Sequence, residues 1–242
     1  EIIDNDKIKR SGLVSNIIDA FVKVYLTQKP NNMVLESLID ETSETIEKNQ
    51  EFASGIIRAF TQGRLNEGED LGNIITNISD IIETRGREDN PDLVSNIISG
   101  FIKGYLDSKP RDFQLLRKLH KELIDIAYEI IKKNKRFTSA IINGFTQGCI
   151  YREAFVDDIS YKIVSIIQKD EIKGDKDSVF NIIKGCTQGC INEKKDCKDI
   201  VKDIFYIIEQ GKMTSDKDSV FNIIKGFTQG CIDKEGDLGK IG

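Results

Sequence analysis

The chain has 242 residues and a composition typical of a helical protein. It contains three Pro and no Trp, and 31% of its residues are charged, which argues against a collagen-like chain, a Pro/Gly-rich disordered chain and an all-β sandwich. The formal net charge of −5 at pH 7 gives no electrostatic reason to bind DNA or RNA, because such binding depends largely on Lys and Arg that neutralise phosphates. We therefore expect no nucleic-acid partner.

Neither a membrane span nor a secreted disulfide framework is indicated. No apolar stretch approaches the ~18 residues that a membrane span needs, and residue 1 is Glu, without the basic start or the apolar core of a signal peptide behind it. The cysteines are odd in number and lie in the second half of the chain, unlike the dense, even framework of a small secreted domain. Reduced thiols, a cytoplasmic location and no membrane partner are expected. The cysteines are Cys149, Cys186, Cys190, Cys197 and Cys231.

A short phrase centred on two adjacent isoleucines recurs six times along the chain. The first Ile of each pair is at position 17, 56, 97, 141, 182 or 223, so that the spacings are 39, 41, 44, 41 and 41 residues. A fixed period of this length is the signature of a repeat architecture. The repeats are expected to begin near residues 11, 51, 91, 136, 176 and 217.

The two ends of the sequence match the interior of the repeat. Residues 2–9 match residues 166–173, a junction between repeats, and residues 235–241 match residues 67–74, where a second helix is expected to begin. We therefore interpret residues 1–242 as a single array that starts and ends within a repeat and has no dedicated polar caps.

Each repeat is expected to form two helices. In the fifth copy, apolar residues recur at i, i+3, i+4, i+7 and i+11 between Val179 and Cys190, behind an N-cap at Asp177 or Ser178. The Asp-Lys-Asp-Ser stretches at Asp175 and Asp216 lack the Gly and the terminal Glu of a calcium loop, so that helix caps explain them better. A second amphipathic helix follows, with counterparts expected at about 33–48, 71–84, 112–132, 153–168 and 200–208.

A two-helix unit cannot bury its apolar stripe alone, so the units must stack on one another. The expected fold is therefore all-α: a right-handed α-solenoid of six two-helix repeats, each of ~41 residues. This period resembles that of the HEAT and armadillo-type repeats, which have ~40–47 residues, and the resemblance covers the whole chain. It is a resemblance of architecture, since the mid-helix Pro and the Asp/Arg ladder of typical HEAT units are absent.

The first helix of the repeat carries two glycines four residues apart, such as Gly185 and Gly189. Two Gly inside a helix cost roughly 2 kcal/mol relative to Ala, so another interaction must offset them. We expect close approach of the neighbouring helix to be that interaction; the alternative is a surface groove in which a ligand approaches the backbone. The equivalent pairs are Gly100 and Gly104, Gly144 and Gly148, and Gly226 and Gly230, with Ala59 and Gly63 a partial match.

Polar side chains lie together on one face of the same helix and would form parallel rows across the stack. In armadillo-like solenoids, rows of Asn on the inner helices hold the backbone of an extended peptide through bidentate amide bonds, and the resemblance implies the same role here, because a carboxamide offers both a donor and an acceptor. The lysines in the rows favour an acidic or polar peptide. The alternative is a solvated helix face of no special function. The candidate binding residues are Asn96, Lys103, Asn181, Lys184, Gln188, Asn222, Lys225 and Gln229.

The sequence offers no catalytic, cofactor-binding or metal-binding set. Cys149, Cys190 and Cys231 share one repeat position and are expected to be buried small apolar residues without disulfides, since helix axes 8–10 Å apart exceed disulfide reach. Cys186 and Cys190 are spaced to meet a soft metal ion, but a tetrahedral site needs further Cys or His, and His120 is the single histidine.

These observations favour a non-enzymatic scaffold or adaptor that binds a protein or an extended peptide. The alternative is a structural repeat protein that self-assembles through its repeat ends into a filament or spacer. An enzyme, or an accessory to one, is the third and weakest reading of the sequence.

Overall fold

The computed structural model describes residues 50–86, 90–109, 116–151, 159–211 and 216–238. All regular secondary structure in these ranges is helical and none is strand, which confirms the predicted all-α class. The first copy of the repeated phrase and the helix expected at 33–48 lie outside the described residues.

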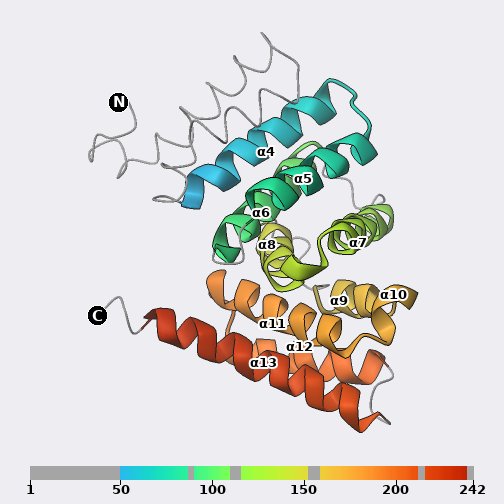
Figure 1. Cartoon of the computed structure of the whole chain (residues 1–242), viewed down its shortest axis with the longest axis vertical. Helices are drawn as coiled ribbons and strands as arrows, with labels where there is room; N and C mark the ends of the chain where they lie inside the picture. Colours follow the sequence, from blue (N-terminus) through green and yellow to red (C-terminus); the bar gives the residue numbers. More distant parts are fainter. Residues whose placement is uncertain (1–49, 87–89, 110–115, 152–158, 212–215, 239–242) are drawn as a thin grey trace.

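The helices that contain the repeated phrase form one row, which we call the first row (Figure 1). Each packs against the next in chain order, and because Gly100 lies against Ser54 while Gly104 lies against Arg58, the first two run parallel. The same offset recurs at the later contacts, so that the whole row is parallel. In chain order the first row is α4 (Gln50–Asn66), α6 (Pro91–Asp107), α8 (Thr138–Ile150), α11 (Lys176–Asn192) and α13 (Lys217–Leu238).

The helices between them form a second row with its own neighbour contacts. In this row α5 packs on α7, α7 on α9 and α9 on α12, and several of its members also contact first-row helices (Figure 1). The short helices η2 (Lys135–Phe137) and α10 (Asp170–Lys173) lie in connections between the rows. The second row consists of α5 (Leu71–Arg85), α7 (Leu116–Lys133), α9 (Ile159–Ile167) and α12 (Cys197–Gln210).

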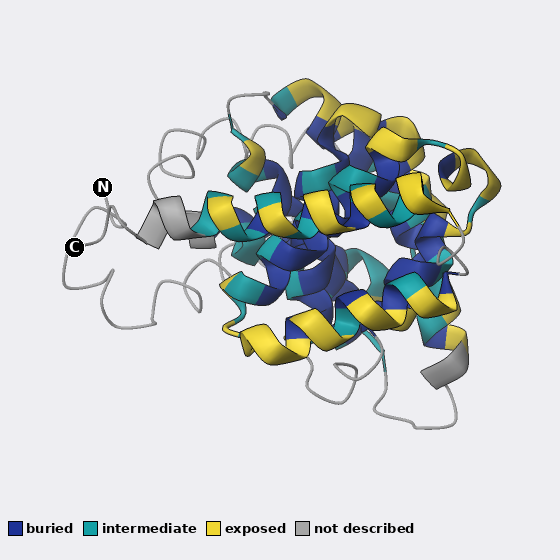
Figure 2. Cartoon of the chain, turned by 90° about the horizontal axis from the view of Figure 1, so that it is seen from below, coloured by how far each residue is buried: buried dark blue, intermediate teal, exposed yellow. Residues whose placement is uncertain are grey.

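The isoleucine pairs of the phrase form the core of the molecule. Both members are buried in α4, α6, α8 and α11. Figure 2 shows that the buried parts of the helices lie in the interior of the molecule. Full burial of a side chain of this size stabilises the fold by about 1.5–3 kcal/mol. The recurring phrase therefore marks the segment of each of these four helices that packs into the apolar core.

Two helix boundaries differ from those expected. The N-cap of α11 is Asp175, not Asp177 or Ser178, because the Asp175 carboxylate accepts hydrogen bonds from the backbone N–H groups of both residues. Capping at the Asp-Lys-Asp-Ser stretch is confirmed, two to three residues earlier than the apolar period indicates. At the other end of the chain, α13 continues to Leu238, so Gly236 does not separate it from a second helix.

The glycine pairs are packing positions, as predicted. A Cβ on Gly144 would lie 2.1 Å from the carbonyl oxygen of Ser95, and one on Gly185 would lie 2.1 Å from that of Ser139. The second glycine of α8, α11 and α13 lies nearest a side chain, and a Cβ on Gly189 would lie 2.6 Å from the Cβ of Thr146. Gly104 of α6 lies nearest the carbonyl oxygen of Arg58. The helices α6, α8, α11 and α13 each present two glycines to the first-row helix before them, and this close contact of backbones offsets the low helix propensity of glycine.

The cysteines are free thiols with different exposure. Cys149 and Cys190 are buried, as predicted for their shared repeat position. Cys186, four residues before Cys190 on α11, is buried as well. Cys231 is only partly buried and Cys197 is exposed.

Candidate functional site

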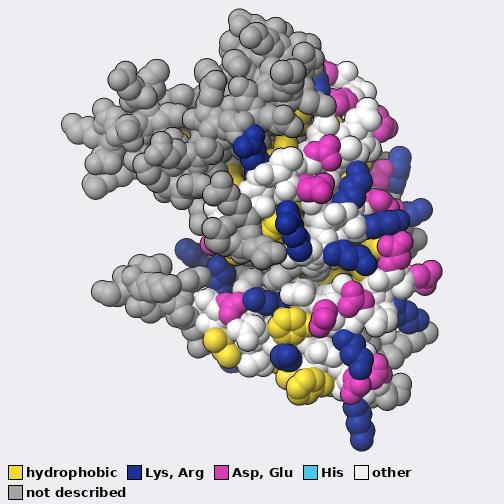
Figure 3. Space-filling view, viewed as in Figure 1, with side chains coloured by type: hydrophobic (Ala, Val, Ile, Leu, Met, Phe, Trp, Pro, Cys, Tyr) yellow, Lys and Arg dark blue, Asp and Glu magenta, His cyan; other side chains and the backbone are white. Residues whose placement is uncertain are grey.

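The first-row helix α11 leaves one narrow side outside the core. On α11 this side carries Asp177, Asn181, Lys184, Gln188 and Asn192, which recur every three or four residues and are exposed or half-buried. Equivalent residues lie along the same line on the other first-row helices. We call the combined surface the polar stripe; with the α11 residues it comprises Arg58, Asn96, Lys103, Asp107, Tyr151, Asn222, Lys225, Gln229 and Asp233. Basic and acidic side chains are interspersed over the described surface in Figure 3, without a large field of one sign.

Two predicted asparagines bind their own helix. Asn181 Nδ2 donates to the carbonyl oxygen of Asp177 at 2.9 Å, and Asn222 Nδ2 donates to that of Asp218 at the same distance. The two side chains are therefore held in equivalent conformations on successive helices. Each bond uses one donor of a carboxamide that has two donors and an acceptor oxygen.

Three other predicted residues meet at one carboxylate that sequence reasoning missed. Asp233 of α13 accepts from Lys184 Nζ at 2.8 Å and from Gln188 Nε2 at 3.1 Å, both on α11. On its own helix it accepts from Gln229 Nε2 at 2.7 Å. Burial raises the pKa of Asp233, but the hydrogen bonds from Lys184 and Gln229 and the Lys184 charge outweigh it, and the pKa lies below the usual range of an Asp.

The two remaining lysines of the predicted set contact aromatic rings. Lys103 Nζ lies 5.2 Å from the centre of the Tyr151 ring, and the guanidinium carbon of Arg58 lies 5.0 Å from the same centre. Two cations therefore contact one aromatic ring. Lys225 Nζ lies 5.2 Å from the centre of the Phe180 ring. Asn96, half-buried on α6, takes part in none of these contacts.

A regular ladder of polar contacts joins successive first-row helices along the stripe. Arg58 Nε donates to Asp107 Oδ2 at 2.7 Å, linking α4 to α6, across 49 residues of sequence. Asn192 Nδ2 donates to Asn143 Oδ1 at 3.2 Å and links α11 to α8 with the same sequence separation of 49 residues. The ion pair between Lys184 and Asp233 has this separation too and links α11 to α13.

At the joint between α6 and α8 the ladder uses another residue. Gln147 Nε2 donates to Ser95 Oγ at 3.2 Å and to Asn143 Oδ1 at 2.8 Å. Among the ladder residues that the sequence analysis did not select, three share one repeat position: Asp107, Asn192 and Asp233. Each follows the second glycine of its helix by three residues, and this fixed position is the signal by which they could have been found.

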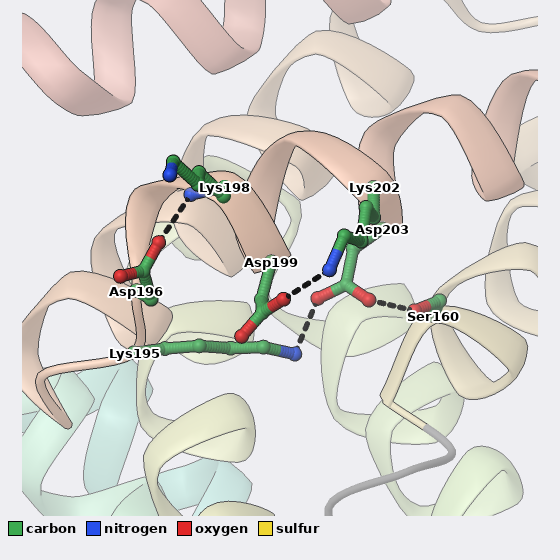
Figure 4. A network of polar contacts seen from close by, with 7 residues as sticks. All are labelled: Ser160, Lys195, Asp196, Lys198, Asp199, Lys202 and Asp203. Carbon is green, nitrogen blue, oxygen red and sulfur yellow. Dashed lines mark hydrogen bonds and ion pairs between the residues drawn. The ribbon is translucent and has the colours of Figure 1, made fainter.

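A separate polar network holds the second row (Figure 4). Lys195 Nζ lies 2.5 Å from Asp203 Oδ2, and Ser160 Oγ donates to Asp203 Oδ1 at 2.7 Å, which ties the loop before α12 to α12 and to α9. Burial lowers the pKa of Lys195, but the hydrogen bond and the charge of Asp203 outweigh it, and the net shift is upward. Beside it, Asp196 caps α12 by accepting from the backbone N–H of Lys198 at 2.7 Å.

The buried thiols near this network are poor nucleophiles. A hydrogen bond to Cys190 and burial raise the pKa of Cys186 well above its ordinary value, and burial raises the pKa of Cys149 to about 12. Among the described residues, no three His, Cys, Asp or Glu side chains are grouped to hold a metal ion. Nor is any helix in the described ranges long and apolar enough to cross a membrane.

Comparisons of the chain with protein-family models, with curated proteins and with solved structures gave no significant match.

Proposed function

We propose that the chain is a non-enzymatic helical-repeat scaffold that binds a protein or an extended peptide along the polar stripe. In this proposal the two rows of helices form a right-handed α-solenoid of six two-helix repeats, of the HEAT/armadillo-like type. The neighbour-to-neighbour contacts within each row, and their parallel register in the first row, support that arrangement.

The interhelical ladder is the observation that carries the proposal. Arg58–Asp107, Asn143–Asn192 and Lys184–Asp233 place side chains of one helix against the next in the same register. A surface held in this way is ordered before a ligand arrives, so that binding loses less side-chain entropy. Equivalent positions on successive parallel helices also suit a ligand whose own groups repeat, such as an extended backbone.

The chemistry of the stripe favours amide recognition over capture of a strongly acidic ligand. Asp107 and Asp233 neutralise Arg58 and Lys184 within the structure. What the stripe offers a ligand is then carboxamides, for example Asn181 and Asn222, together with the exposed Tyr151 ring. Carboxamides pair with peptide groups, and an exposed aromatic ring accommodates an apolar or cationic side chain.

Peptide display against the intact chain tests this function. A random peptide library is selected on the wild-type protein, and the selected peptides are measured by fluorescence anisotropy against a variant in which Asn181, Gln188, Asn222 and Gln229 are all changed to Ala. We expect at least a tenfold loss of affinity while helical circular dichroism is unchanged.

A matched variant controls for a general loss of surface polarity. It changes four exposed polar residues of α12 to Ala, namely Lys198, Lys202, Glu209 and Gln210, and should bind the peptides as the wild type does. Equal affinity of wild type and the polar-stripe variant would refute a binding role for the stripe.

A structural protein that self-assembles through its repeat ends is the second candidate function. One observation favours it: α12 and α13 expose large apolar side chains, among them Phe205, Phe221 and Ile224. Light scattering over a concentration series separates the two, because open-ended growth of the assembly is expected only for the second.

A further inference from the structure

The ladder along the polar stripe follows one rule of sequence position. The residue directly after the Ile pair of one first-row helix contacts, on the next helix, the residue that follows the second glycine by three positions. The rule identifies two positions that are expected to meet at each joint between first-row helices. The pairs that obey it are Arg58 and Asp107, Asn143 and Asn192, and Lys184 and Asp233.

The joint between α6 and α8 departs from this rule. Ser99 follows the Ile pair of α6, and Tyr151 follows the second glycine of α8 by three residues. Ser99 is 1% exposed and its hydroxyl makes no hydrogen bond to a described residue, whereas Tyr151 is 43% exposed. The contact that closes the other joints is therefore missing here, and the Tyr151 side chain is open to a further partner.

Tyr151 contacts two cations from earlier helices of the row. The guanidinium carbon of Arg58, on α4, lies 5.0 Å from the centre of the ring, and Lys103 Nζ, on α6, lies 5.2 Å from it. Asp107 of α6 accepts a hydrogen bond from Arg58 Nε at 2.7 Å. Three successive first-row helices thus bring one exposed ring, two cations and one carboxylate together. We call this group the tyrosine site: Arg58, Lys103, Asp107 and Tyr151.

The tyrosine site differs in charge from the other contacts of the ladder. The contact between Asn143 and Asn192 is uncharged, and Lys184 meets one carboxylate, that of Asp233. Within the tyrosine site two cations meet one carboxylate, which leaves one net positive charge. A ligand that lies along the stripe therefore meets an anion-attracting group at this joint and neutral contacts at its neighbours.

Donors dominate the tyrosine site. An ammonium and a guanidinium offer only hydrogen-bond donors, and the hydroxyl of the exposed Tyr151 can donate as well. Such donors bind a carboxylate through short, charge-assisted hydrogen bonds. One carboxylate also matches the net charge of the site, whereas a phosphate dianion exceeds it. The open ring provides an apolar surface for the carbon atoms beside the carboxylate.

We infer that the tyrosine site binds one carboxylate of the peptide and thereby determines where along the stripe the peptide lies. The carboxylate is either the C terminus of the peptide or an Asp or Glu side chain. This inference rests on the proposed function, to which it adds a fixed register. Amide contacts at equivalent positions of successive helices accept the same backbone in several registers, and a charged site at one joint selects one of them.

Parallel selections test the inference. A random peptide library with free C termini is selected on the 242-residue wild-type protein and on Lys103→Glu, which makes the net charge of the site negative. Wild-type peptides should share one acidic residue, or their C-terminal carboxylate, at a fixed distance from the rest of the consensus. Peptides selected on Lys103→Glu should lack this feature and carry Lys or Arg in its place.

Neutral analogues of a selected peptide identify the source of the carboxylate. One analogue has an amidated C terminus, and the other has Asn or Gln in place of the shared Asp or Glu. The analogue that has lost the bound carboxylate should bind about fivefold more weakly in fluorescence anisotropy, the upper range for an exposed ion pair. The other analogue should bind as its parent does.

Variants of the protein locate the effect. Lys103→Met removes the charge but keeps a long side chain, and it should weaken the parent peptide about fivefold while its neutral analogue is unaffected. Lys198→Glu, the same charge reversal at an exposed residue of α12, should bind every peptide as the wild type does. Helical circular dichroism checks that each variant is folded.

Two outcomes overturn the inference and leave the proposed function standing. One is equal acidic content in the peptides selected on wild type and on Lys103→Glu; the other is a set of neutral analogues that bind the wild type as tightly as their parent. In both cases the loss of affinity in the polar-stripe variant would still support binding along the stripe. A library that yields no binder refutes the proposed function and this inference together.

Discussion

The carbonyl oxygen of Ser139 on α8 occupies the space that a side chain of Gly185 on α11 would need. A Cβ built on Gly185 lies 2.1 Å from that oxygen, and equivalent contacts join the other first-row helices. Since the obstructing atom belongs to the backbone, it cannot move aside by a change of rotamer. The spacing of the first row is therefore set by the absence of a side chain.

Gly185→Ala should destabilise the protein by about 2 kcal/mol. The substitution gains up to ~1 kcal/mol of helix propensity, but overpacking against a backbone atom costs more than it returns. Chemical denaturation followed by circular dichroism measures the difference.

Gly55→Ala is the matched control for this substitution. Gly55 also lies inside a first-row helix, α4, but among the described residues a Cβ there would have no atom within 4 Å beyond its own stretch of helix. It should stabilise the protein by about 0.5–1 kcal/mol, because only the propensity term remains. If Gly185→Ala were stabilising as well, the close packing of first-row helices would be wrong.

Asp203→Ala should be costly, because it leaves a mostly buried cation without its partner. The side chains of Lys195 and Asp203 are 17% and 18% exposed, and Asp203 also accepts a hydrogen bond from Ser160. Removal of one member of a buried pair costs about 3 kcal/mol. The unfolding free energy of the variant reports this loss, and the additional change Lys195→Met should recover part of it.

Asp199→Ala on the same helix provides the comparison. Asp199 pairs with Lys202 at 2.8 Å on an exposed part of α12. An exposed pair of this kind contributes roughly 0–1 kcal/mol, so we expect little change in stability. Similar effects of the two substitutions would contradict the structural role assigned to Asp203.

The contact between Lys184 and Asp233 should depend on pH in an acidic window. The folded state lowers the pKa of Asp233, so the stabilisation is fully present above the unfolded pKa of ~3.9 and is lost as the pH falls through the lower, folded value. A double-mutant cycle with Lys184→Met and Asp233→Asn should give a coupling of about 0.5 kcal/mol at pH 7. The coupling should shrink as the pH is lowered below ~4 and when salt is added. A coupling that stays constant over this range would show that the two charges do not interact.

The five thiols should react at different rates with a chromogenic disulfide at pH 8. Cys197 is exposed and should react first, whereas burial raises the pKa of Cys149 to about 12 and Cys186 and Cys190 are buried as well. Cys197→Ser should remove the fast phase, and denaturant should expose every thiol. Rapid modification of Cys149 in the native protein would contradict its burial.

The sequence by itself determined the helical class, the period and the core. The recurring Ile pair at Ile97, Ile141 and Ile182 predicts the buried side of the first-row helices, because apolar spacing and the helical period are local properties that burial then rewards. The packing role of Gly144 and Gly185 could also be predicted, since glycines at this spacing inside a helix need an interaction that offsets their cost.

Only the tertiary structure decided which polar residues meet. The sequence predicts that Lys184 and Gln188 belong to a ligand-binding row. In the structure both contact Asp233 of the next first-row helix, and this contact depends on the register of the two packed helices. The N-cap of α11 is Asp175, and not Asp177 or Ser178 as predicted, for a similar reason. The geometry of the first turn, and not the apolar period, determines which carboxylate reaches the free N–H groups. Helical periodicity determines which side of a helix is polar; the packing of neighbouring helices determines what that side contacts, and this second step is not encoded in any one segment of the chain.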